Sequence, residues 1–221
     1  ECKMKKNFII TLAWPEGMVT AAGAWYDKIL SNQGKYRVGH AALVLINGET
    51  KESCYFDFGR YHTPKGYGRV RDAESDPDLE LIKPIIKNGE LINLKKILIQ
   101  LHAMKATHGE GKLYASLLAG INFDNAYSLA KRMQKKDMIS YGPFVRNGTN
   151  CSRFVATILQ ASKPPFIKRL RLKYPFCISP SPKRNVSITN NQYFVVENKK
   201  CKHIKKSKIK AYFTSIESYN D

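Results

Sequence analysis

The chain has 221 residues, of which 43% are hydrophobic and 11% aromatic; it can bury a core, and an intrinsically disordered protein is excluded. The length suits one large domain, or one domain with a long appendage. Lysine and arginine number 37 against 18 aspartates and glutamates. The net charge of +19 excludes an acidic chaperone or buffer and favours anionic partners such as nucleic acid, phospholipid or cell-wall polymer.

The N-terminal segment contains a short apolar run, and the residues after it predict a helix. Residues 8–14 are too few for the apolar core of a secretory signal, and no run of 18 apolar residues predicts a membrane span. Since the chain begins with Glu1 rather than Met, a removed upstream leader stays an open alternative. We expect a helix from about Pro15 through Leu30.

The next segment predicts a β-hairpin and a loop. The stretches Val38–Ile46 and Glu52–Phe58 flank Asn47-Gly48, and this dipeptide is typical of hairpin turns because both residues tolerate positive φ. Residues 59–78 carry arginine and lysine among glycine and proline, which predicts a long surface loop.

The remaining elements interleave strands with helices. We expect a second hairpin around Asn88-Gly89, helices at Leu94–Ala106, Asp124–Lys136 and Cys151–Ala161, and strands at Leu113–Ile121 and Gln192–Glu197. Hairpins among helices, without βαβ units, indicate an α+β fold in which an antiparallel sheet packs against helices.

The positive charge is concentrated near the C-terminus. Residues 163–210 hold 14 lysines and arginines and a single acid, Glu197. We therefore expect a folded domain at residues 1–162 and a basic C-terminal extension at residues 163–221, and the sequence leaves open whether this extension packs on the domain.

Cys151 is the first candidate for chemistry. Asn150 can cap a helix that begins at Cys151, and the free backbone N–H groups of a helix start stabilise a thiolate. A small apolar residue at the start of a buried helix is the alternative interpretation of Cys151.

His40 and Asp57 are the candidate partners of this thiol. A histidine inside an apolar strand can serve as the base for a helix-borne cysteine. If the hairpin turns at Asn47–Glu49, Asp57 lies on the same face of the sheet as His40. Asp57 would then fix the imidazole tautomer, with Glu52 as the alternative.

These stretches resemble a known family. Gly39–Leu45 (GHAALVL) is similar to the histidine hairpin of papain-like, NlpC-type cysteine hydrolases, and Asn150–Val155 (NCSRFV) to their nucleophile helix. The order, His before Cys, resembles the circularly permuted branch that includes YiiX-like proteins and relatives of lecithin:retinol acyltransferase. The strings YFDFGRY and GYGRVRD also resemble a Bacteroidetes family of unknown function.

The resemblance implies a circularly permuted papain-like fold and a thiol hydrolase that cleaves amide bonds in peptide or peptidoglycan-like substrates. A lipid acyltransferase or lipase using the same site is the alternative. It also implies a tyrosine near the nucleophile that helps to hold the oxyanion, for which Tyr141 is the candidate. The protein would be bacterial, and either cytoplasmic or exported by a specialised route.

Basic residues directly follow Asp57 in the chain. Arg60, Arg69 and Arg71 would lie at the rim of the site, where guanidinium groups recognise carboxylate or phosphate. They are the candidate substrate-binding residues, and a solvated loop of charges is the alternative.

The sequence predicts neither a metal site nor a cofactor. Cys177, Cys201 and His203 match no zinc spacing, and no P-loop or HExxH motif is present. A third class of function, a nucleic-acid or anionic-surface binding protein, is suggested by aromatic residues among the lysines of residues 163–210.

Overall fold

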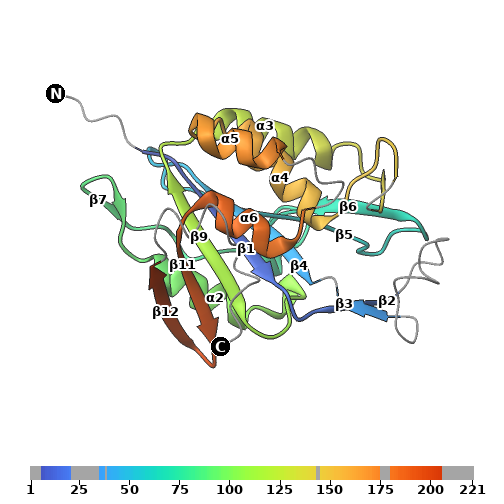
Figure 1. Cartoon of the computed structure of the whole chain (residues 1–221), viewed down its shortest axis with the longest axis horizontal. Coiled ribbons are helices and arrows are strands. Elements are labelled where there is room, and N and C mark those ends of the chain that lie inside the picture. The colour runs from blue at the N-terminus through green and yellow to red at the C-terminus, as the bar shows by residue number, and fades with distance from the viewer. Residues whose placement is uncertain (1–5, 21–34, 38, 143–144, 175–179, 206–221) are drawn as a thin grey trace.

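The computed structural model of the chain describes residues 6–20, 35–37, 39–142, 145–174 and 180–205. Its main element is an antiparallel sheet (Figure 1). The strands of this sheet are β1 (Phe8–Trp14), β4 (His40–Ile46), β5 (Ser53–Gly59), β6 (Tyr67–Arg71), β9 (Leu113–Ala119), β10 (Ile139–Ser140), β11 (Gln192–Glu197) and β12 (Lys200–Lys205). Within the described residues they form eight neighbouring strands in the order β10-β6-β5-β4-β1-β9-β11-β12.

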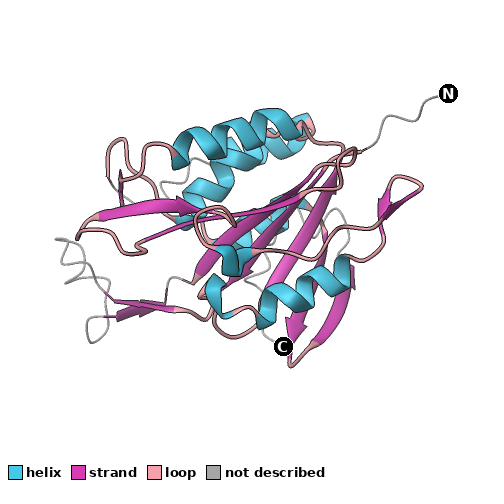
Figure 2. Cartoon of the chain, turned by 180° about the vertical axis from the view of Figure 1, so that it is seen from behind, coloured by secondary structure: helices cyan, strands magenta, loops and turns pink. Residues whose placement is uncertain are grey.

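Helices cover both faces of the sheet, as the two opposite views show (Figures 1 and 2). The helices are α2 (Leu94–Ala103), α3 (Phe123–Gln134), α4 (Cys151–Ala161), α5 (Phe166–Lys173) and α6 (Pro182–Thr189), with short 3-10 turns η1 (Pro77–Leu79) and η2 (Lys105–Thr107). Helix α2 packs on one face, and α3, α4 and α6 pack on the other. Two small hairpins, β2 (Met18–Thr20) with β3 (Lys35–Arg37) and β7 (Ile86–Lys87) with β8 (Glu90–Leu91), complete the fold.

The central strands are buried on both faces, which explains their continuous apolar sequences. On β1, Ile10 and Leu12 pack toward α2, whereas Ile9 packs toward α3 and α4. Every residue of β1 is buried because side chains alternate between two covered faces. The sheet is therefore the middle layer of three.

The predicted α+β class, with an antiparallel sheet packed against helices, is confirmed. The predicted bounds of Cys151–Ala161 and Gln192–Glu197 are those of α4 and β11. The hairpin around Asn47-Gly48 forms β4 and β5.

Two expectations about local structure are wrong. Residues 59–78 are not one loop, because Tyr67–Arg71 forms β6 and pairs with β5. The helix expected from Pro15 is replaced at Met18–Thr20 by β2, whose backbone pairs with β3. The remainder of that expected helix, residues 21–34, lies outside the described residues.

The basic C-terminal region contributes to the same sheet as the N-terminal residues. Strand β11 pairs with β9, and the buried Ser116 of β9 donates its hydroxyl to the carbonyl of Val186 on α6 at 2.7 Å. The described part of residues 163–221 thus packs on the domain. None of the described helices combines the length and apolar character that crossing a membrane requires.

Gly39 holds the turn that leads into β4. Its φ is +66°, and a Cβ atom there would lie 2.5 Å from the carbonyl oxygen of Trp14. Only glycine fits both the left-handed conformation and this close approach.

We expect Gly39→Ala to destabilise the protein by several kcal/mol, since strain in φ adds to a clash with backbone. Gly66→Ala is the matched control, because Gly66 has φ +86° with no atom within 4 Å of the new Cβ; it should cost about 1 kcal/mol. Urea unfolding measures the free energy of unfolding of both variants. If both lost the same amount of stability, the close approach of Gly39 to Trp14 would have no part in the effect.

Candidate active site

His40 is the first residue of β4 and is held against a packed wall. Its ring stacks on the indole of Trp14, the residue opposite it on β1, with ring centroids 5.8 Å apart. The side chain keeps 13% of its surface exposed. The ring is therefore oriented by packing, while part of it remains accessible to a substrate.

Asp57 lies beside His40 on the neighbouring strand. It is in register with Ala42, which places it on the same face as His40, and its Oδ2 is 3.2 Å from Nε2 of His40. The alternative, Glu52, is exposed and accepts a hydrogen bond from the hydroxyl of Thr50. The structure brings Asp57 to His40 and leaves Glu52 in the hairpin turn.

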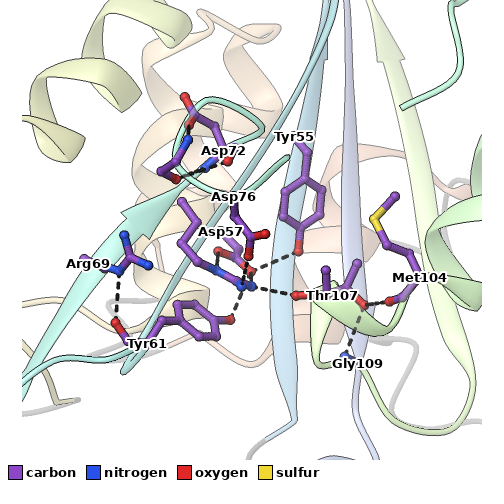
Figure 3. A network of polar contacts seen from close by, with 12 residues as sticks. Tyr55, Asp57, Tyr61, Arg69, Asp72, Asp76, Met104, Thr107 and Gly109 are labelled. Carbon is purple, nitrogen blue, oxygen red and sulfur yellow. Dashed lines mark hydrogen bonds and ion pairs between the residues drawn. The ribbon is translucent and has the colours of Figure 1, made fainter. Parts of the chain in front are cut away.

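The carboxylate of Asp57 is fully buried and surrounded by donors (Figure 3). The hydroxyls of Tyr55 and Tyr61 donate to Oδ2 at 3.0 and 2.9 Å. Arg71 donates from Nε to Oδ1 at 3.1 Å and from Nη2 to Oδ2 at 2.7 Å. Burial alone would raise the pKa of Asp57, but the hydrogen bonds and charges of His40 and Arg71 outweigh it and lower that pKa. Asp57 is therefore a carboxylate at neutral pH.

Arg71 is itself fixed from several sides. Its Nη1 donates to Asp76 at 2.9 Å and its Nη2 to the carbonyl of Ala106 at 2.9 Å. The guanidinium carbon lies 3.4 Å from the centre of the Tyr61 ring. This cation is a rigid part of the site, with only 3% of its side chain exposed.

Cys151 approaches from the other face of the sheet, at the start of α4. The Asn150 side chain caps this helix by accepting the N–H of Arg153 at 2.9 Å. The Cys151 thiol forms a hydrogen bond with His40, and the backbone N–H of Ala41 also points to the sulfur. Because Nε2 of His40 faces Asp57, Nδ1 is the ring nitrogen left for Cys151.

The three groups shift each other's protonation. Burial lowers the pKa of His40, but the hydrogen bonds to Asp57 and Cys151 outweigh it and raise that pKa to about 9. Burial raises the pKa of Cys151, but the hydrogen bond and charge of His40 outweigh it, and the thiol pKa lies below its usual value. A proton on His40 and a thiolate at Cys151 therefore stabilise each other.

The other expected site residues lie around this centre. The ring of Tyr141 stacks on Phe58 at 5.7 Å, and the guanidinium of Arg60 lies 5.5 Å from the Tyr141 ring centre. Arg69 donates from Nε to the carbonyl of Tyr61 at 2.9 Å. Arg71 was expected at the rim, but it is buried because it neutralises Asp57.

Sequence reasoning missed the donors that fix Asp57. Tyr55 lies two residues before Asp57 on the same strand face, so the alternation of β5 could have found it. The function of Arg71 as a buried partner could not be found, since its strand was interpreted as a loop. Tyr61 lies after the end of β5, where no alternation of side chains predicts that its hydroxyl points to Asp57.

The antiparallel sheet packed against helices is a papain-like fold, and within it a sheet-borne histidine and carboxylate meet a cysteine at a helix start. The chain belongs to the TseH-like family of type VI secretion system effectors, whose family model matches residues 9–165. Its structure is similar to the crystal structure of the type VI secretion system effector TseH, with a TM-score of 0.66 and 21% sequence identity. The similarity covers 92% of this chain and 100% of TseH. No curated protein matches the chain.

Removal of Arg71 tests the buried ion pair. We expect Arg71→Gln to destabilise the protein by about 3 kcal/mol or more at pH 7, because Asp57 would remain buried without its cation. Arg69→Gln is the matched control from the same strand and should cost about 1 kcal/mol, since it loses a hydrogen bond to a backbone carbonyl.

The pH dependence of the same variant has a definite sign. In the wild type, the lowered pKa of Asp57 gives a stabilisation that is present above the unfolded-state pKa and is lost as the pH falls through the folded-state pKa. Without Arg71, the buried carboxyl of Asp57 takes up a proton more readily. The difference in the free energy of unfolding between the wild type and Arg71→Gln should therefore become smaller as the pH falls. Urea unfolding across this pH range checks it, and a difference independent of pH would contradict the ion pair as its cause.

Proposed function

We propose that the protein is a cysteine hydrolase that cleaves an amide bond in a peptide or peptidoglycan-like substrate. Cys151 is the nucleophile, His40 the general base and acid, and Asp57 the group that orients His40. The observation that supports this most is the continuous chain of contacts from Cys151 through His40 to the ionised Asp57.

The reaction follows from the protonation of these groups. The thiolate of Cys151 attacks the carbonyl carbon, and the carbonyl oxygen becomes an oxyanion. Nδ1 of His40 then gives its proton to the leaving amine as the C–N bond breaks. His40 next takes a proton from water, which attacks the thioester and releases the acid and the thiolate.

The oxyanion needs donors that are already in place. The backbone N–H of Cys151 is one, because it lies at the first position of α4 and has no partner within the helix. Tyr141 is the proposed second donor, from the neighbouring segment that packs on Phe58.

The chain order supports a permuted arrangement. His40 and Asp57 precede Cys151, as in the circularly permuted NlpC-type and YiiX-like proteins, and we propose this relation for the catalytic residues. The similarity of YFDFGRY to a Bacteroidetes family of unknown function stays a prediction.

The effector family supports a bacterial target. We propose the peptide part of peptidoglycan as the substrate, because an anionic polymer suits a chain of net charge +19. Arg60 and Arg69 flank the site and are proposed to bind substrate carboxylates, whereas Arg71 acts through Asp57. The acyl bonds of phospholipids are the alternative substrate for the same three residues.

Alkylation by iodoacetamide tests the thiolate. We expect Cys151 to react fastest, with an apparent pKa well below about 8.5, because the charge of His40 favours the thiolate. Cys54, whose pKa burial raises to about 11, and Cys201, whose pKa burial also raises, are internal controls that should react slowly. In His40→Ala the apparent pKa of Cys151 should rise. Mass mapping identifies each thiol, and an inert Cys151 would remove the basis of the hydrolase proposal.

Incubation with purified peptidoglycan tests the substrate. New amino groups and shorter peptides should appear with the wild type, and Cys151→Ala and His40→Ala should each lower the rate by roughly 10³-fold or more. Asp57→Asn should also lower it, since the amide carries no charge to stabilise the imidazolium. Release of fatty acid from phospholipid vesicles would select the alternative substrate. Salt-dependent nucleic-acid binding that Cys151→Ala leaves unchanged, without either cleavage, would favour a binding protein instead.

A further inference from the structure

Helix α5 lies at the outside of the helical layer, in orange near the top of Figure 1. It packs sideways against α4 and α6. Leu172 points inward to the core between the sheet and α3 and α4, and Lys168 donates from Nζ to the carbonyl of Ile188 at 3.2 Å. These two residues define the inner face of the helix.

The outer face of α5 is apolar, the reverse of an ordinary surface helix. Phe166, Ile167 and Leu170 are 66%, 58% and 42% exposed, and Tyr174 at the C-cap is 53% exposed. At 3.6 residues per turn, these positions fall within an arc of about 100° that faces away from Leu172. Contiguous exposed apolar side chains of this kind mark an interaction surface.

Basic residues border the apolar arc on both sides. Arg169 and Lys173 follow one edge, and Arg171 follows the other. Helix α5 contains no aspartate or glutamate. An apolar stripe between basic residues is the pattern of helices that lie in the plane of an anionic membrane surface.

We propose that α5 docks the protein on an anionic lipid bilayer, with Phe166, Ile167 and Leu170 inserted among the lipids. Arg169, Arg171 and Lys173 contact the phosphate groups of the headgroups. A protein partner would have to supply both an apolar groove and an acidic border, whereas an anionic bilayer presents both chemistries over its whole surface. This docking is independent of the proposed hydrolase activity, because α5 contributes no residue to the site of Cys151 and His40.

Vesicle co-sedimentation with the full chain tests the proposal. Phosphatidylcholine vesicles with added phosphatidylglycerol should bind the wild type more tightly than pure phosphatidylcholine does. Phe166→Ser/Leu170→Ser should weaken this binding by roughly tenfold or more, through lost burial in the lipid. Arg169→Gln/Lys173→Gln should weaken it by roughly fivefold per residue and reduce its sensitivity to salt.

The matched control is Ile85→Ser/Ile92→Ser, which removes two exposed apolar side chains, 46% and 52% exposed, from the β7–β8 region. It should bind as the wild type does. Cys151→Ala should also bind as the wild type, so a failure of the hydrolase proposal would leave this result unchanged. The proposal would be overturned if the α5 variants bound anionic vesicles as tightly as the wild type does, or if the wild type bound neutral and anionic vesicles equally. It would also be overturned if Phe166→Ser/Leu170→Ser changed the self-association of the protein but not its binding to vesicles.

Discussion

The candidate site depends on the ion pair between Asp57 and Arg71. A carboxylate removed from water is stable only when charge and hydrogen bonds replace its hydration. Arg71 supplies the charge, and Tyr55 and Tyr61 supply two further donors. The fixed negative charge then raises the pKa of His40, and protonated His40 in turn lowers that of Cys151. The pKa of the Cys151 thiol thus depends, through Asp57 and His40, on the buried cation of Arg71.

The sheet makes this arrangement possible because its strands lie between two hydrophobic cores, one on each face. His40 and Asp57 belong to the face covered by α2, whereas Cys151 lies in the core formed with α3 and α4. At the start of β4, which follows the turn at Gly39, His40 from one face meets Cys151 from the other. The candidate site therefore joins two hydrophobic cores that share the strands of one sheet.

Local sequence patterns predicted the elements that carry Cys151 and His40, the candidate nucleophile and base. The cap at Asn150 fixed the start of α4, and alternation in the hairpin placed Asp57 with His40, because both rules act within a few residues. Strand β6 was not predicted, because arginines among glycines are typical of an exposed loop. Only the contact with Asp57 shows why Arg71 is buried in a strand. The packing of β11 on β9 was equally hidden, because pairing between distant strands leaves no local pattern.

Within the part of the chain that the structure describes, both edges of the sheet have features that discourage pairing with a second molecule. One edge is β10, which has only two residues, Ile139–Ser140. The other is β12, which carries Lys200, Lys202 and Lys205. If a second copy paired with this strand, these positive charges would lie close to the same charges of that copy. Short strands and lysines at edges discourage pairing between molecules. Part of the basic character of the C-terminal region thus lies along a strand at the edge of the sheet, where like charges oppose the pairing of two copies.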